Sequence, residues 1–453
     1  MKTQNSRSVC LVATAAALAL AIALAPVALA QYDQASPQND RPKSRKEREA
    51  EANAAKTGEA PKAEYSKEFK KLAAPVQKDA NEKKWPEVLA ALPALDALPA
   101  QSLDERKAIA TWRLQATQGV GDQDAFAAAI ETFLSEGFAD PESAGAMHRQ
   151  LAAHYSAKQD KEKTLLHYQK YVDTLPAVQA EDYETLGRLQ AQTSHYPEAS
   201  QNLGKAIELT AAKNEKPKEM WFQLRDRCFI EMKDDAGRLA NLESLVRYYP
   251  DKEYYSRVVA IYQSQYKDDR AVMLNAYRLA ISDPQGGLAT VGGYLNYVDA
   301  ALVSGSPGEA ARALERGMKD GVVPAAGTNQ DLLAEARSAV TQDKKSLPGE
   351  AAAAAKNAKG EMDVKVGLGF YSTGEFQQAV EATRRGIAKG GVARLDDANM
   401  LLGASLLELG RGDEARAAFE AAAAAAPDGS AMARIAGLWI ALTSRTEMAP
   451  AAG

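Results

Sequence analysis

The chain has 453 residues, of which 46% are hydrophobic but only 7% aromatic, and it carries a formal net charge of −5. Alanine dominates the apolar residues, and because alanine enters a helix at the lowest cost of any residue, this composition predicts an all-α fold. A mildly acidic chain without a basic stripe argues against nucleic-acid binding, which depends on neutralising phosphates.

Residues 1–30 have the features of a secretory signal peptide. Two basic residues precede an apolar core, Val9–Leu24, and the segment ends in the small-x-small pattern Ala28-Leu29-Ala30. We expect cleavage after Ala30 and a periplasmic location. The uncharged stretch from Ser8 is also long enough for an uncleaved membrane anchor, and either alternative places the following residues outside the cytoplasm.

Residues 31–64 are predicted to form a disordered polar tether, because six basic and six acidic residues between 31 and 61 leave too little apolar surface to order it. The alternative is a transient helix over Lys43–Lys56 that docks on a partner. Residues 65–140 then predict divergent helical hairpins, in which Pro93 kinks or ends the helix that begins at Pro86, so that Pro86–Leu98 forms two short helical pieces.

The clearest repeat lies in residues 395–429. Its residues fall at the offsets of a 34-residue helix–turn–helix unit: Leu402, Gly403, Ala415, Phe419 and Pro427. Small Gly403 and Ala415 let two helices approach closely, and Phe419 fills the remaining space. The stretch resembles the tetratricopeptide repeat family, although Asn399 stands in the slot where the family has tryptophan.

The same register recurs through residues 141–320 and 360–429. The further signature residues are Leu151, Tyr155, Pro176, Leu186, Gly187, Ala199, Gly367 and Ala379. The resemblance implies an all-α, right-handed α-α superhelical solenoid of tetratricopeptide-like hairpins. A helix over 430–445 is predicted to cap its end, followed by a disordered tail at 446–453. Residues 321–359 predict an irregular helical pair or insertion, because Leu347-Pro348-Gly349 should break a helix.

The sequence contains no pattern that indicates catalysis, a metal site or a cofactor. Its histidines lack zinc-binding spacing and are predicted at the surface or between helices: His148, His154, His167 and His195. The acid pairs Asp268-Asp269 and Asp396-Asp397 are predicted at helix N-termini, where they favour the helix dipole. Cys228, alone outside the signal segment, is predicted to lie in the core.

In tetratricopeptide-repeat proteins the inner surface comes mostly from the first helix of each repeat. Carried onto this register, the partner-binding positions are Arg149, Glu184, Arg188, Gln192, Phe222, Asp226, Phe229, Gln263, Asn296 and Asp299. The resemblance therefore implies a mixed groove for an extended or helical peptide, with Phe222 and Phe229 as exposed aromatic anchors.

These patterns favour a non-catalytic periplasmic scaffold, monomeric or a small oligomer, that binds a protein or peptide partner in a cell-envelope process. An alternative is binding of a saccharide or peptidoglycan fragment, because nine of the 17 tyrosines lie between Tyr248 and Tyr297 and could stack sugars. The same clustering makes residues 219–300 the first choice for a binding surface. A third alternative is a self-assembling structural repeat protein.

Overall fold

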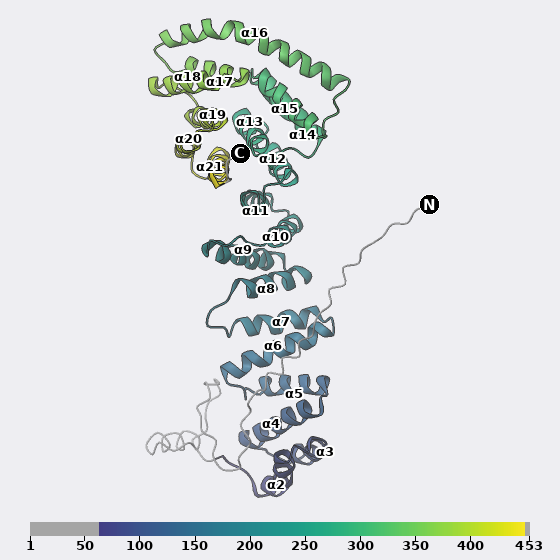
Figure 1. Cartoon of the computed structure of the whole chain (residues 1–453). Coiled ribbons are helices and arrows are strands. Elements are labelled where there is room, and N and C mark those ends of the chain that lie inside the picture. The colour runs from purple at the N-terminus through teal and green to yellow at the C-terminus, as the bar shows by residue number, and fades with distance from the viewer. Residues whose placement is uncertain (1–62, 449–453) are drawn as a thin grey trace, which may run out of the picture. The chain divides into compact units, whose positions relative to one another are not determined.

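The computed structural model describes residues 63–448, which contain twenty α-helices and no strand (Figure 1). The predicted signal segment, most of the tether and the end of the tail lie outside these residues. The chain divides into two compact units, Met1–Val178 and Gln179–Gly453. Among the helices described, not one combines the length and apolarity that crossing a membrane requires.

The described part of the first unit, residues 63–178, contains six helices that pack in consecutive pairs. They are α2 (Lys67–Asn81), α3 (Trp85–Asp96), α4 (Leu103–Val120), α5 (Gln123–Ser135), α6 (Pro141–Ala157) and α7 (Lys161–Val172). Side-chain caps begin several of them. Ser102, for example, accepts from the backbone N–H of Glu105, whose carboxylate accepts from the backbone N–H of Ser102 in turn, and this capping box fixes where α4 starts.

The second unit consists of fourteen helices. Its first six are α8 (Ala180–Gln192), α9 (Tyr196–Ala212), α10 (Glu219–Met232), α11 (Asp235–Tyr248), α12 (Lys252–Tyr266) and α13 (Arg270–Ser282). The others are α14 (Val291–Val303), α15 (Pro307–Lys319), α16 (Thr328–Lys356), α17 (Glu361–Thr373), α18 (Phe376–Lys389), α19 (Leu395–Glu408), α20 (Gly412–Ala425) and α21 (Ala431–Met448).

A glycine on the first helix lies close to the second helix in three hairpins: α8–α9, α17–α18 and α19–α20. A Cβ atom built on Gly403 would lie 2.4 Å from the Phe419 ring, and one on Gly367 would lie 2.2 Å from Thr383 Oγ1. Gly187 meets Leu203 in the same way, at 2.7 Å. In each hairpin the contacted residue follows the glycine by the same interval, and the intervening small residue is fully buried: Ala199, Ala379 and Ala415. The predicted repeat register is confirmed at these three hairpins.

Two prolines predicted to interrupt helices lie inside continuous ones, so both predictions are wrong. Pro93 lies within α3, and Pro348 lies within the 29-residue helix α16. A single continuous helix here contradicts the predicted irregular pair but not the predicted insertion. Both prolines are exposed, so the carbonyl that each leaves unpaired can bond to water. Leu347 next to Pro348 is buried and would contact a Cβ at Gly369 on α17. This packing holds α16 together through the proline.

The last helix, α21, packs against α20 and also against two helices far away in sequence, α11 and α13 (Figure 1). Arg434 on α21 donates two hydrogen bonds to Glu243 on α11, at 3.1 and 3.0 Å. Trp439 stacks on Phe419 with ring centroids 4.9 Å apart, and its Nε1–H donates to the backbone oxygen of Asn275 on α13 at 3.4 Å. The C-terminal helix therefore caps α20 and also joins the end of the second unit to its middle.

Candidate functional site

Three of the predicted groove residues are buried on α10. Phe222 is fully buried, with its ring centroid 5.9 Å from that of Tyr248, and Phe229 is 7% exposed. Asp226 is also buried and pairs with Arg238 at 3.0 Å and, more loosely, with Arg257 at 3.7 Å. The prediction of exposed aromatic anchors is therefore wrong, because α10 turns these side chains into its contacts with neighbouring helices.

The other predicted groove residues are exposed or half-buried at the positions that the register gave them. They are Arg149, Glu184, Arg188, Gln192, Gln263, Asn296 and Asp299. Glu184 on α8 pairs with Lys218, the residue before α10, at 2.6 Å. The guanidinium carbon of Arg149 lies 5.6 Å from the centre of the Tyr171 ring, within the first unit.

Arg188, Gln192 and Asp299 have side chains with no hydrogen bond or ion pair to any residue that the structure describes. Glu184, Arg188 and Gln192 follow one another at steps of one helical turn on α8. The three therefore share one face of the helix. Since Glu184 pairs with Lys218 just before α10, this face of α8 is turned toward α10, the first helix of the next hairpin. Within the predicted groove, α8 is the helix that carries two such side chains, Arg188 and Gln192.

The tyrosines between residues 248 and 297 belong mainly to the core. Six of them are at least nine-tenths buried: Tyr254, Tyr255, Tyr262, Tyr277, Tyr294 and Tyr297. The hydroxyl groups of all of these except Tyr277 donate to acids, as Tyr255 does to Asp283 at 2.8 Å and Tyr294 to Asp320 at 2.8 Å. The tyrosine-rich surface predicted for sugar stacking is therefore not formed. Cys228 is fully buried as well, and burial raises the pKa of its thiol to about 11.

A cleft of about 280 Å³ lies inside the second unit, between α13, α17 and α19. Leu274, Leu368 and Leu401 supply apolar walls. Its charged lining residues carry both signs: Arg270, Arg278, Lys365, Arg394, Glu361 and Asp397.

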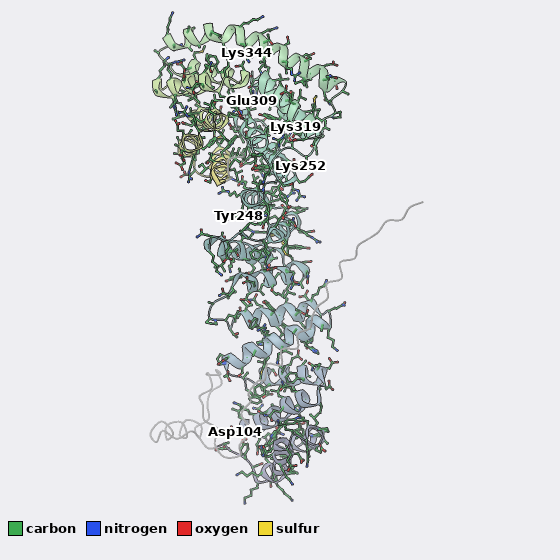
Figure 2. All side chains as sticks on the ribbon, in the orientation of Figure 1. Asp104, Tyr248, Lys252, Glu309, Lys319 and Lys344 are labelled. Carbon is green, nitrogen blue, oxygen red and sulfur yellow. The ribbon has the colours of Figure 1, made fainter. Side chains whose placement is uncertain are left out.

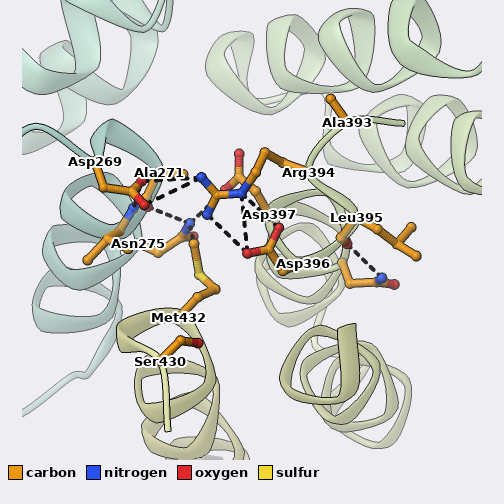
Figure 3. Close-up of polar contacts among 12 residues, drawn as sticks. Asp269, Ala271, Asn275, Ala393, Arg394, Leu395, Asp396, Asp397, Ser430 and Met432 are labelled. Carbon is orange, nitrogen blue, oxygen red and sulfur yellow. Dashed lines mark hydrogen bonds and ion pairs between the residues drawn. The ribbon is translucent and has the colours of Figure 1, made fainter. Parts of the chain in front are cut away.

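Polar contacts beside this cleft join α13 to α19 (Figure 3). The guanidinium of Arg394 bonds to Asp396 at 3.0 Å and reaches Asp269, the N-cap residue of α13, at 3.4 Å. Asn275 donates from Nδ2 to Asp397 at 2.8 Å. Burial raises the pKa of Asp397, although nearby Arg278 opposes the shift. The two acid pairs do lie at helix N-termini as predicted, and they also connect the middle of the second unit to its end.

A buried ion pair joins Arg278 on α13 to Glu309 on α15. Figure 2 labels Glu309. The guanidinium donates from Nε at 2.7 Å and from Nη2 at 2.6 Å to the two carboxylate oxygens, and the two side chains are 2% and 1% exposed. Ser306 and Tyr297 also donate to Glu309, at 2.6 and 3.1 Å. Burial alone would raise the pKa of Glu309, but Arg278 outweighs it and holds this pKa below its ordinary value.

Sequence reasoning missed this junction, although one signal for it was present. Asn275 and Arg278 interrupt the apolar run Val272–Ala280, and a long polar side chain inside a buried helix requires a partner elsewhere in the chain. Within residues 63–448, no group of three or more histidine, cysteine or acidic side chains is arranged to hold a metal ion. The polar contacts beside the second-unit cleft join α13 to residues at the start of α19.

No known sequence family matches the chain, and no curated protein matches it. Solved structures with similar helix order include a tetratricopeptide repeat protein from Parabacteroides merdae, at 10% identity over 66% of this chain and 99% of that chain, with a TM-score of 0.25. Another is the TPR domain of P58(IPK), at 15% identity over 84% and 99% of the two chains, with a TM-score of 0.20.

A third is the TPR2AB domain of yeast Sti1 in a complex with pHSP90, at 9% identity over 67% and 99% of the chains, with a TM-score of 0.22. Identities and scores this low carry no argument about function. The assignment of the fold rests on the glycine-marked hairpins of this chain. The fold is a tetratricopeptide-like α-α solenoid. The last helix of the second unit, α21, packs against α11 and α13 from the middle of that unit.

Proposed function

We propose that this tetratricopeptide-like solenoid is a non-catalytic scaffold that binds a protein or peptide partner in a cell-envelope process. The observation that carries the proposal is the polar face of α8, where Arg188 and Gln192 are exposed and bonded to no other described side chain. Exposed side chains on the first helices of stacked hairpins can contact an extended chain without rearrangement of the core. Saccharide binding has lost its main support, since the tyrosines that suggested it are largely buried.

A photo-crosslinking amino acid at Gln192 is expected to capture a discrete partner from envelope fractions. The matched control carries the same amino acid at Gln201, an exposed residue on α9, the second helix of the same hairpin. We expect an adduct of one defined mass from position 192 and none from position 201. Mass spectrometry of the adducts, in a chain whose folding is confirmed by circular dichroism, gives the answer.

The substitution Arg188→Glu in the 192 crosslinking chain tests whether the captured partner contacts this face. It reverses the free charge one helical turn away and leaves the core unchanged, so the yield of the adduct is expected to fall at least about fivefold. Equal capture from positions 192 and 201, or a yield unaffected by Arg188→Glu, would place the partner elsewhere and refute the proposed binding face.

We further propose that residues 1–30 direct export to the periplasm and are removed after Ala30. The support is the charge and small-residue pattern of the segment. Expression of the full chain in a Gram-negative host should give a periplasmic product whose N-terminal residue is Gln31, read by mass spectrometry. Ala28→Arg should block cleavage and leave the full-length chain at the membrane. A cytoplasmic, uncleaved parent chain would contradict the proposal.

A further inference from the structure

A cleft in the first unit lies among α5, α6 and α7 and is independent of the face proposed for a partner. Its volume is about 430 Å³, which is in the range of small-molecule sites. The apolar part of its lining comes from Leu134, Ala139, Ala144 and Leu166. Leu166 is 49% exposed, so the apolar wall continues to the surface.

The polar part of the cleft consists mainly of lysine ammonium groups and histidine imidazoles. Lys163, His167 and Lys170 lie at successive turns on one face of α7, and His148 faces them from α6. Lys170 is exposed and has no hydrogen bond or ion pair to a described residue. Glu131 on α5 is the only acid among the described lining residues, which therefore carry an excess of positive charge.

Glu131 is already engaged by its neighbours and cannot neutralise Lys170. It accepts a hydrogen bond of 2.5 Å from the Tyr155 hydroxyl, and the Lys163 ammonium lies 3.8 Å away. Lys163 itself bonds to the Tyr155 oxygen at 3.1 Å. Among the described residues that line the cleft, Lys170 is therefore the charge left without a counter-charge.

The two histidines meet through their Nδ1 atoms, 3.1 Å apart. One nitrogen must donate and the other accept, so the pair is bonded only while at least one imidazole is neutral. Burial, then His167 and Lys170, lowers the pKa of His148 to about 4, and burial also lowers the pKa of His167 despite the opposing charge of Glu131. His154 on α6 lies apart from the pair, 3.5 Å from Asp124.

We propose that this cleft binds a small organic carboxylate with a short apolar tail, and that binding is coupled to proton uptake by the His148–His167 pair. The carboxylate would pair with Lys170 and the tail would lie along Leu134 and Leu166. A bound anion beside the imidazoles favours their charged form, so protons and the carboxylate must strengthen each other's binding.

Apolar lining and a single free cation suit a monocarboxylate better than a phosphate. A phosphate carries more charge and needs several converging donors to replace its hydration, whereas here Lys163 is already bonded to Tyr155. The proposal therefore commits to an amphipathic carboxylate, with phosphate as a contrary outcome.

The test is a calorimetric titration of the full chain with hexanoate at pH 7.5 and pH 6.0. If the bound anion restores the pKa of one histidine to its ordinary value of about 6.5, affinity should rise about fourfold at the lower pH. Hexanol and hexylammonium, which keep the tail but lack the negative charge, should bind at least about tenfold more weakly. Histidine NMR signals should shift only with hexanoate.

Matched variants separate binding from its proton coupling. Lys170→Met should abolish hexanoate binding, while Lys158→Met, at an exposed lysine on the same unit that pairs with Asp124, should leave it unchanged. The double variant His148→Gln,His167→Gln, checked by circular dichroism, should still bind at pH 7.5 and lose the gain at pH 6.0. Tighter binding of inorganic phosphate, equal binding of hexanol, or a pH-independent affinity in the parent chain would each overturn the proposal.

Discussion

Glu309→Ala is expected to destabilise the second unit by about 3–5 kcal/mol, the largest single effect on its stability. The variant leaves the Arg278 guanidinium at 2% exposure with neither of the carboxylate oxygens that it now bonds at 2.7 and 2.6 Å. Breaking a buried pair by removing one partner costs far more than the pair itself contributes, because an uncompensated charge stays behind. Native-state hydrogen exchange of the α13 and α15 amides in denaturant measures the loss.

Glu315→Ala is the matched control. Glu315 lies on α15, as Glu309 does, and pairs with Arg337 on α16 at 2.7 Å. The side chains of Glu315 and Arg337 are 44% and 62% exposed, so the loss of stability in Glu315→Ala should stay below about 1 kcal/mol. The double variant Arg278→Met,Glu309→Leu should recover much of the stability lost in Glu309→Ala, since it removes both charges together. Equal costs for the alanine variants at 309 and 315 would contradict the assignment of a buried pair.

The pH dependence of the same pair has a defined sign. The folded-state pKa of Glu309 lies below its ordinary value, so the unfolded chain binds more protons as the solution becomes acidic. The contribution of Glu309 to stability is therefore present above the ordinary glutamate pKa, about 4.3, and falls as pH drops through the lowered pKa. The parent chain should lose this contribution in acid, and Arg278→Met,Glu309→Leu should not.

The repeat register was predictable because close helix approach restricts the sequence strongly. Gly187, Gly367 and Gly403 each sit where a Cβ would collide with the paired helix, so only glycine fits and its spacing can be read directly. The hairpin α10–α11 shows no such glycine on its first helix. There the register alone placed Phe222 on the surface, while the free-energy gain from burying an aromatic ring turned it into the core.

The contacts that join α19 and α21 to α11 and α13 could not be derived from periodicity. Arg434 bonds to Glu243, and Asn275 bonds to Asp397, across intervals of 191 and 122 residues. A repeat pattern records only contacts between neighbouring units, and such distant partners leave no periodic trace. The polar residues of α13 showed that a partner was needed, but not which one.

Gly308→Ala is expected to cost about 3 kcal/mol, because α15 touches α17 at this residue. A Cβ atom on Gly308 would lie 1.8 Å from the backbone oxygen of Ser372 and 2.6 Å from its carbonyl carbon. Backbone atoms cannot move aside as a side-chain end can, so the two helices must separate. Separation would also break the bonds that Gly308 N–H and Arg312 make with Ser372, at 2.9 and 2.8 Å.

Gly349→Ala on the neighbouring helix α16 is the control for this substitution. No atom lies within 4 Å of a Cβ built there, and alanine in a helix interior is favoured over glycine, so stability should rise by about 0.5–1 kcal/mol. Urea unfolding of both variants measures the two opposite changes. If Gly308→Ala left the free energy of unfolding unchanged, α15 and α17 would not be in contact at this residue. Helix α16 alone would then link them. A large loss would show that α15 and α17 pack directly against each other at Gly308 and Ser372.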